Sequence, residues 1–129
     1  MQKDKRQSAF LLRTGIIVAA IVLHQIFLPW WGLVIACLLA GYLTAPMGRS
    51  AFLAGFSAAF LTWSLYALYL DLQNDEILSS RMIQLFPLPD VPLLLVPITG
   101  LLGGVVGGFA CKSGDLFRRF FWKEKARYY

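Results

Sequence analysis

Residues 97–111 read Pro-Ile-Thr-Gly-Leu-Leu-Gly-Gly-Val-Val-Gly-Gly-Phe-Ala-Cys, and the spacing of their glycines predicts how the chain folds. The glycines form two neighbouring rows with four-residue spacing, Gly100-Gly104-Gly108 and Gly103-Gly107. On a helix both rows share one side, which a second helix backbone can approach closely. In water each glycine costs a helix about 1 kcal/mol relative to alanine, whereas in lipid the backbone must satisfy its own hydrogen bonds. We therefore interpret the stretch as the packing face of a membrane-spanning helix.

The composition favours the same environment. The chain has 129 residues, of which 58% are hydrophobic and 15% charged, and its mean hydropathy is +0.64. A soluble domain usually carries about a quarter charged residues. We expect the net charge of +5 to reflect cations that flank the membrane, not nucleic-acid binding. Cys37 and Cys111 lie in or beside apolar stretches, so we expect neither a disulfide framework nor a zinc site.

Four apolar segments are candidates to cross a bilayer, at residues 8–28, 31–46, 50–70 and 91–111. About 20 helical residues cover the roughly 30 Å hydrocarbon layer. The second segment is shorter, so it either crosses where the bilayer thins or forms a re-entrant hairpin with the first; crossing is favoured. Bulky residues follow the first segment where a cleavage site would need small ones, so we expect it to be retained and not removed as a signal peptide.

The residues that flank and line these segments fit a bundle. Trp30 and Trp31 mark the headgroup depth between the first two segments. Arg13 is expected to extend its guanidinium group to the lipid headgroups. The third segment repeats small residues every four positions, which predicts that it packs on the glycine face of the fourth. These residues are Ala51, Gly55 and Ala59.

Two further stretches are expected at the membrane surfaces. Residues 71–90 form an outer loop that contains a short amphipathic helix, with Ile77 and Met82 on its apolar side and Ser79 on its polar side. Residues 112–129 form a basic, aromatic cytoplasmic tail, in which each cation near an anionic leaflet contributes about 1 kcal/mol. The cations expected to contact headgroups there are Arg118, Arg119, Lys123 and Lys125.

The distribution of cations predicts the orientation. With four crossings, eleven of the twelve Lys and Arg residues lie on the side of the two chain ends, and only Arg81 lies opposite. The opposite side also carries four acids, Asp71, Asp75, Glu76 and Asp90. The positive-inside rule then places both ends in the cytoplasm, and we expect the inner (cytoplasmic) cell membrane of a prokaryote.

Few side chains in the spans suggest chemistry. His24, the single histidine, is a candidate for a transport or ligand site, although an interhelical hydrogen bond is its expected role. Thr99 is the second polar candidate, beside a kink expected at Pro97. The sequence has no carboxylate at mid-membrane depth, no nucleophile–base pair and no cluster of metal ligands. We therefore expect no enzymatic activity, no cofactor and no metal.

The sequence predicts an all-α integral membrane protein. It is expected to be a single domain, 1–129, with four transmembrane helices in a bundle and a short amphipathic surface helix between the third and the fourth. Its expected function is that of a non-catalytic small subunit or scaffold of a larger membrane complex, because contact surfaces are plentiful and chemical groups are scarce. The expected partners are the anionic inner leaflet, other membrane subunits and further copies of the chain. The alternative is a small homo-oligomeric channel or transporter.

Overall fold

The computed structural model describes residues 2–27, 29–44, 50–87 and 89–125; for residues 2–6, 26 and 122–125 it describes the backbone alone. The elements in chain order are α1 (Gln2–Phe27), α2 (Gly32–Leu43), α3 (Ser50–Gln73), α4 (Ile77–Ile83), the 3-10 helix η1 (Pro92–Leu94) and α5 (Leu95–Lys125). The predicted all-α class is confirmed. Three stretches are long and apolar enough to cross a membrane, Gln7–Gln25, Ser50–Gln73 and Pro92–Phe121.

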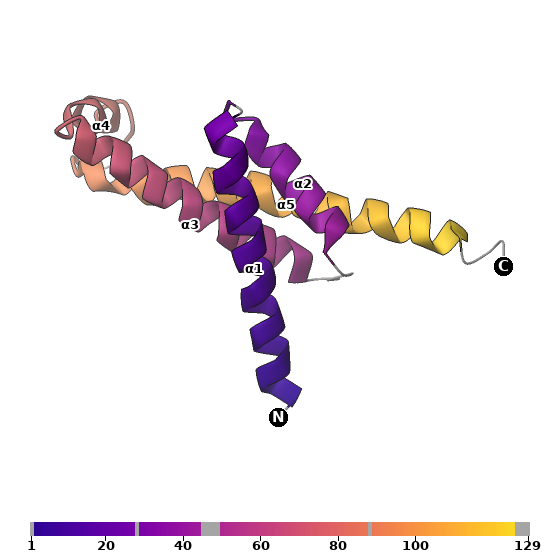
Figure 1. The fold of residues 1–129 in the computed structure, drawn as a ribbon. Coiled ribbons are helices and arrows are strands. Elements are labelled where there is room, and N and C mark those ends of the chain that lie inside the picture. Colours follow the sequence, from indigo (N-terminus) through magenta and orange to yellow (C-terminus); the bar gives the residue numbers. More distant parts are fainter. Residues whose placement is uncertain (1, 28, 45–49, 88, 126–129) are drawn as a thin grey trace.

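Helices α3 and α5 are the centre of the molecule. They run side by side in opposite directions and make its most extensive helix–helix contact (Figure 1). Helix α2 packs along the middle and later part of α5, and α1 lies beside α2 and crosses steeply over α3 (Figure 1). The predicted docking of the third apolar segment on the fourth is what the structure shows.

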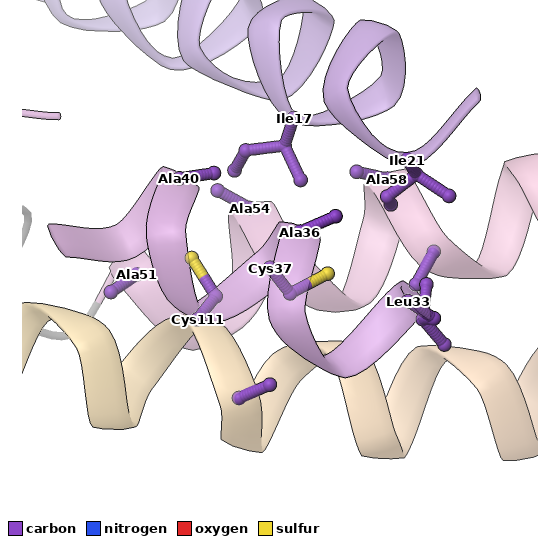
Figure 2. Packing of buried hydrophobic residues seen from close by; sticks show 12 residues of the cluster. Ile17, Ile21, Leu33, Ala36, Cys37, Ala40, Ala51, Ala54, Ala58 and Cys111 are labelled. Atoms are coloured by element: carbon purple, nitrogen blue, oxygen red, sulfur yellow. The ribbon is translucent and has the colours of Figure 1, made fainter. Parts of the chain in front are cut away.

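Small residues make the close packing of these helices feasible. In α3 the buried residues are Ala51, Ala54, Gly55, Ala58 and Ala59. In α2 they are Gly32, Leu33, Ala36, Cys37, Ala40 and Gly41. Helix α1 adds the larger side chains of Ile17 and Ile21, which rest on the alanines of α2 and α3 (Figure 2). The core between α2, α3 and α5 is therefore thin and is filled mainly by alanine, glycine and cysteine, and Ile17 and Ile21 cover it from α1.

The second apolar segment forms a shorter helix than the expected span of residues 31–46. Helix α2 has 12 residues and is therefore about 18 Å long, against a hydrocarbon layer of roughly 30 Å. It ends at Leu43, and the rest of the expected segment lies outside the described residues apart from Thr44. The described helices thus include three of the four expected crossings.

Helix α5 differs from the expected fourth span at both ends. Because it begins at Leu95, Pro97 lies in its first turn, where backbone N–H groups have no partner within the helix. The expected kink at Pro97 therefore has no cause. At the other end the helix continues past Cys111 to Lys125, so the expected tail begins as a direct extension of the span.

The expected surface helix is α4, and it has seven residues. Asp75 and Glu76 have left-handed backbone conformations, with φ of 51° and 57°, where the chain turns between α3 and α4. The assignment of its faces is wrong for Ser79, which is buried and donates a hydrogen bond of 3.1 Å to the Glu76 carbonyl. Met82, expected on the apolar side that lies on the outer membrane surface, is exposed within the chain.

Candidate functional site: the helix contact face and its charged end

One row of α5 glycines meets the backbone, an alanine and a tryptophan ring of α3. A Cβ atom placed on Gly107 would lie 2.5 Å from the Ala59 Cβ atom and 3.1 Å from the Gly55 carbonyl oxygen. A Cβ atom on Gly103 would lie 2.8 Å from the indole ring of Trp63. Real Cβ atoms do not come this close to other atoms, so any side chain at Gly107 would force the two backbones apart.

The second row of α5 glycines lies against three phenylalanines of α3. The pairs are Gly100 with Phe60, Gly104 with Phe56 and Gly108 with Phe52. The three rings follow one another at four-residue spacing, and consecutive ring centroids are 6.0 Å apart. Sequence reasoning missed this row of rings, although the four-residue spacing was available as a signal. The glycines of the second row give space to phenylalanine rings. In the first row, Gly107 gives space to the α3 backbone and Gly103 to the indole ring of Trp63.

Helices α2 and α5 also meet through their backbones. A Cβ atom on Gly41 of α2 would overlap the carbonyl oxygen of Cys111, and one on Gly114 of α5 would overlap the carbonyl oxygen of Leu38. The backbone nitrogen of Tyr42 would lie 2.9 Å from the same Gly114 Cβ atom. Gly114 was not among the predicted packing residues, because the sequence suggests that the span ends at Cys111.

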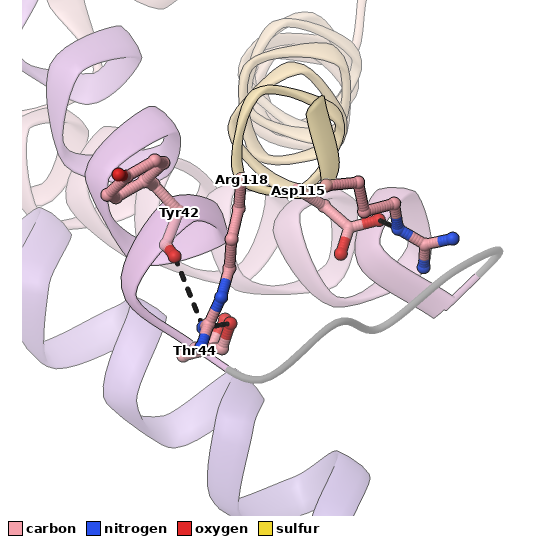
Figure 3. Close-up of polar contacts among 5 residues, drawn as sticks. Tyr42, Thr44, Asp115 and Arg118 are labelled. Carbon is pink, nitrogen blue, oxygen red and sulfur yellow. Dashed lines mark hydrogen bonds and ion pairs between the residues drawn. The ribbon is translucent and has the colours of Figure 1, made fainter. Parts of the chain in front are cut away.

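A charged group on α5 closes the carboxyl end of α2. The Nη1 atom of Arg118 donates hydrogen bonds to the carbonyl oxygens of Tyr42, at 3.3 Å, and Leu43, at 3.0 Å, and also to that of Thr44 (Figure 3). The last carbonyls of a helix have no partner within the helix and carry the negative end of its dipole. A guanidinium group donates hydrogen bonds to these carbonyls, and its positive charge interacts favourably with the helix dipole. Helix α2 therefore ends at a cation supplied by another helix.

An acid lies one turn before this arginine. Asp115 is fully buried, and its Oδ2 atom lies 3.1 Å from the Nε atom of Arg119, whose side chain is 45% exposed (Figure 3). A buried carboxylate is costly unless it is paired, so the ion pair explains how the structure accommodates it. Sequence reasoning missed Asp115. The signal was present, since steps of four from Gly107 lead to Cys111 and then to Asp115.

The two polar candidates predicted within the spans are each bonded to their own helix. The Nδ1 atom of His24 lies 3.0 Å from the Ala20 carbonyl oxygen, and the Thr99 hydroxyl donates a 2.8 Å hydrogen bond to the Leu95 carbonyl. Within the described part of the chain, the contact of His24 is with its own helix, so the expected interhelical hydrogen bond stays a prediction. No group of three possible metal ligands occurs among the described residues.

The expected headgroup residues lie in different surroundings. Trp30 and Trp31 are exposed at the turn before α2, and Arg13 is half-buried on α1. Arg118 and Arg119 are engaged by the protein itself, as described above. The side chains of the other two expected cations, Lys123 and Lys125, lie outside the described residues, although both belong to the last turn of α5.

Two polar atoms of α3 are buried opposite the α5 glycines. The Trp63 Nε1 atom and the Ser64 hydroxyl make no hydrogen bond within the described residues.

Comparisons with protein-family models, curated proteins and solved structures find no match. We therefore infer the function from the surfaces and contacts of this chain.

Proposed function

We propose that the chain is a multi-pass protein of the inner cell membrane, with four membrane-inserted helical segments and both ends in the cytoplasm. The distribution of Lys and Arg supports this orientation. So does the arrangement of the helices, since α4 and the turn between α1 and α2, both assigned to the outer side, lie toward the same side of the molecule (Figure 1). The beginning of α1 lies toward the opposite side (Figure 1). Helix α2 enters from the outer side and depends on Arg118 for its inner end.

Within that membrane we propose that the protein is a non-catalytic small subunit or scaffold of a larger complex. The observation that carries this proposal is the free surface of α1. Only 11% of its apolar window is buried within the chain, against 33% in α3 and in α5. A Cβ atom placed on Gly15 would have no atom within 4 Å, and Ala19, one turn later, is exposed. A small-residue pair on a free helix face suits close packing with a second transmembrane helix.

The test is site-specific photo-crosslinking in intact membranes. A benzoylphenylalanine at Ile16 or Leu23 of α1 is expected to give a discrete adduct with another membrane protein or with a second copy of the chain. The matched controls are Leu61 of α3 and Leu101 of α5, which are also exposed. Adducts from the control positions alone, or no protein adduct from α1, would contradict the proposed role.

The second candidate function is a small homo-oligomeric channel or transporter. The buried, unbonded Trp63 Nε1 atom and Ser64 hydroxyl favour it, because such groups usually bond to water or to a neighbouring chain. A path along α3 and α5 would pass both groups. Reconstituted protein that moves an ion or small solute, with the flux reduced by Ser64→Ala, would establish this function. No flux across a broad solute panel would leave the subunit role as the better account.

A further inference from the structure

The exposed apolar surface of α5 extends well beyond the expected end of its span. Between Leu101 and Phe109 the exposed residues are Leu101, Leu102, Val105, Val106 and Phe109. After Cys111 the series resumes with Leu116, Phe117, Phe120 and Phe121, which are 53%, 54%, 68% and 54% exposed. Successive residues of a helix are rotated by about 100° about its axis, so these last four side chains occupy a sector of about 140° around α5. Leu102 and Phe109 lie in the same sector. The lipid-facing stripe of the span therefore continues along one side of the helix to Phe121.

Cations border both edges of this stripe. By the same helical spacing, Arg118 and Lys125 lie along one edge, and Arg119 and Lys123 lie along the other. Asp115 lies on the opposite, buried side of the helix. An apolar stripe with cations at its edges is typical of a helix at the surface of an anionic leaflet, where the rings enter the acyl region and the cations meet phosphates.

The continuity of α5 restricts how this stripe reaches the membrane. The apolar stretch from Pro92 to Phe121 has 30 residues, which is about 45 Å of helix, against a hydrocarbon layer of roughly 30 Å. The helix has no break at Cys111, so its last turns cannot bend to lie flat on the surface. If α5 stood upright, the four large side chains would be in water, which is unfavourable for apolar surface. An oblique helix avoids this cost.

We propose that α3 and α5 cross the bilayer as an obliquely tilted pair, so that the stripe Leu116–Phe121 lies in the anionic inner leaflet. A 45 Å stretch fits a 30 Å layer at a tilt of about 48°. The 24 residues of α3 span about 36 Å and also exceed the layer. The window Gln7–Gln25 of α1 spans about 28 Å and fits the layer when upright, in agreement with the steep crossing of α1 over α3 (Figure 1). This inference rests on the proposed membrane insertion but not on the subunit role.

Spin labels on α5 test where the stripe lies. Cysteines replace Phe117 or Phe121, one at a time, in a Cys37→Ala/Cys111→Ala background that keeps both buried Cβ atoms. The labelled protein is placed in vesicles of phosphatidylcholine and phosphatidylglycerol. Leu102, exposed in mid-span, serves as the lipid reference, and Asn74, exposed between α3 and α4, serves as the water reference. We expect labels at both phenylalanine positions to be more accessible to oxygen than to a water-soluble nickel complex, as at Leu102.

Accessibility like that of Asn74 at both positions would overturn the proposal, because the stripe would then lie in water. A second measurement needs no cysteine: infrared dichroism of a labelled carbonyl at Val106 in bilayers of increasing thickness. We expect the tilt of α5 to fall from about 48° at 30 Å to about 39° at 35 Å. A tilt near 20° that does not change with thickness would also overturn the proposal. The subunit role is tested by the crosslinking experiment on α1, which does not involve α5. Failure of that role can therefore be distinguished from failure of the tilt proposal.

Discussion

The pair formed by α3 and α5 differs from α1 in how it is held in the molecule. Along α3 and α5, glycine and alanine let backbones and rings approach each other over most of the length of α3. The apolar stretch of α1 is about as hydrophobic as that of α3, but α1 is attached chiefly through Ile17 and Ile21. In lipid, apolar side chains gain little by leaving the acyl chains for a protein interior, so close packing decides which helices associate. Hydrophobicity therefore makes all three helices suitable for a membrane, while small residues determine which two of them pack closely.

The largest expected effect comes from filling the α3–α5 contact. Gly107→Leu should separate the two backbones, because even a Cβ atom there would lie 2.5 Å from that of Ala59. We expect a loss of about 3 kcal/mol in unfolding free energy, or no folded protein. Gly15→Leu on α1 is the matched control, since nothing lies near that position, and it should change the free energy by less than about 0.5 kcal/mol. Unfolding in mixed micelles measures both, and equal effects would remove the distinction between the two regions.

The next effect concerns the buried acid at the inner end of the pair. Arg119→Gln leaves the fully buried Asp115 without its ion pair, and we expect it to cost about 2 kcal/mol. Asp115→Asn should cost less, because the Arg119 side chain is 45% exposed and can reach water or headgroups. Arg81→Gln, at an exposed position on α4, is the control and should have no measurable effect. A larger loss in Asp115→Asn than in Arg119→Gln would show that the acid is stabilised mainly by other contacts.

A smaller and more local effect is expected at the end of α2. Arg118→Gln removes the cation that binds the carbonyls of Tyr42, Leu43 and Thr44, and it should cost about 1 kcal/mol. Hydrogen exchange should become faster in the last turn of α2 while α3 keeps its protection. Arg118→Lys keeps the positive charge but lacks the planar guanidinium group with its several N–H donors. The exchange rate should therefore lie between those of the wild-type protein and Arg118→Gln. Unchanged exchange in α2 would mean that the cap does not hold the helix end.

The smallest effect is expected for the histidine of α1. His24→Phe removes only the hydrogen bond between His24 and the Ala20 carbonyl of the same helix, so the unfolding free energy should change by less than about 1 kcal/mol. Thermal unfolding in detergent measures this change. A destabilisation of several kcal/mol would show that α1 is bound to the pair by a polar contact, against the comparison made above.

The sequence predicted those parts of the fold that depend on local composition. The length of the apolar stretches is sufficient to identify α1, α3 and α5. The four-residue spacing of small residues from Ala51 to Ala59 indicates a helix–helix contact. The end of α2 could not be predicted, because its cap, Arg118, lies 74 residues after Thr44. The continuation of α5 was missed because Lys112 lowers the hydropathy without interrupting the helix.

The buried acid was missed for a related reason. Asp115 looked like part of a solvated tail as long as Cys111 was taken as the end of the span. Whether a carboxylate so close to the membrane surface is buried depends on the tertiary packing around α5, and hydropathy does not report that packing. The predicted polar candidates were chosen for their position within the spans, yet His24 and Thr99 bond to their own helices.

The most direct test of the central claim is a pair of distance distributions measured by double electron–electron resonance in lipid nanodiscs. One pair of spin labels joins the exposed positions Leu65 of α3 and Leu101 of α5, and the other joins Leu12 of α1 and Leu61 of α3. We expect a narrow distribution for α3–α5 and a distinctly broader one for α1–α3 in the isolated protein. Equal widths, or a broad distribution between α3 and α5, would contradict the central claim.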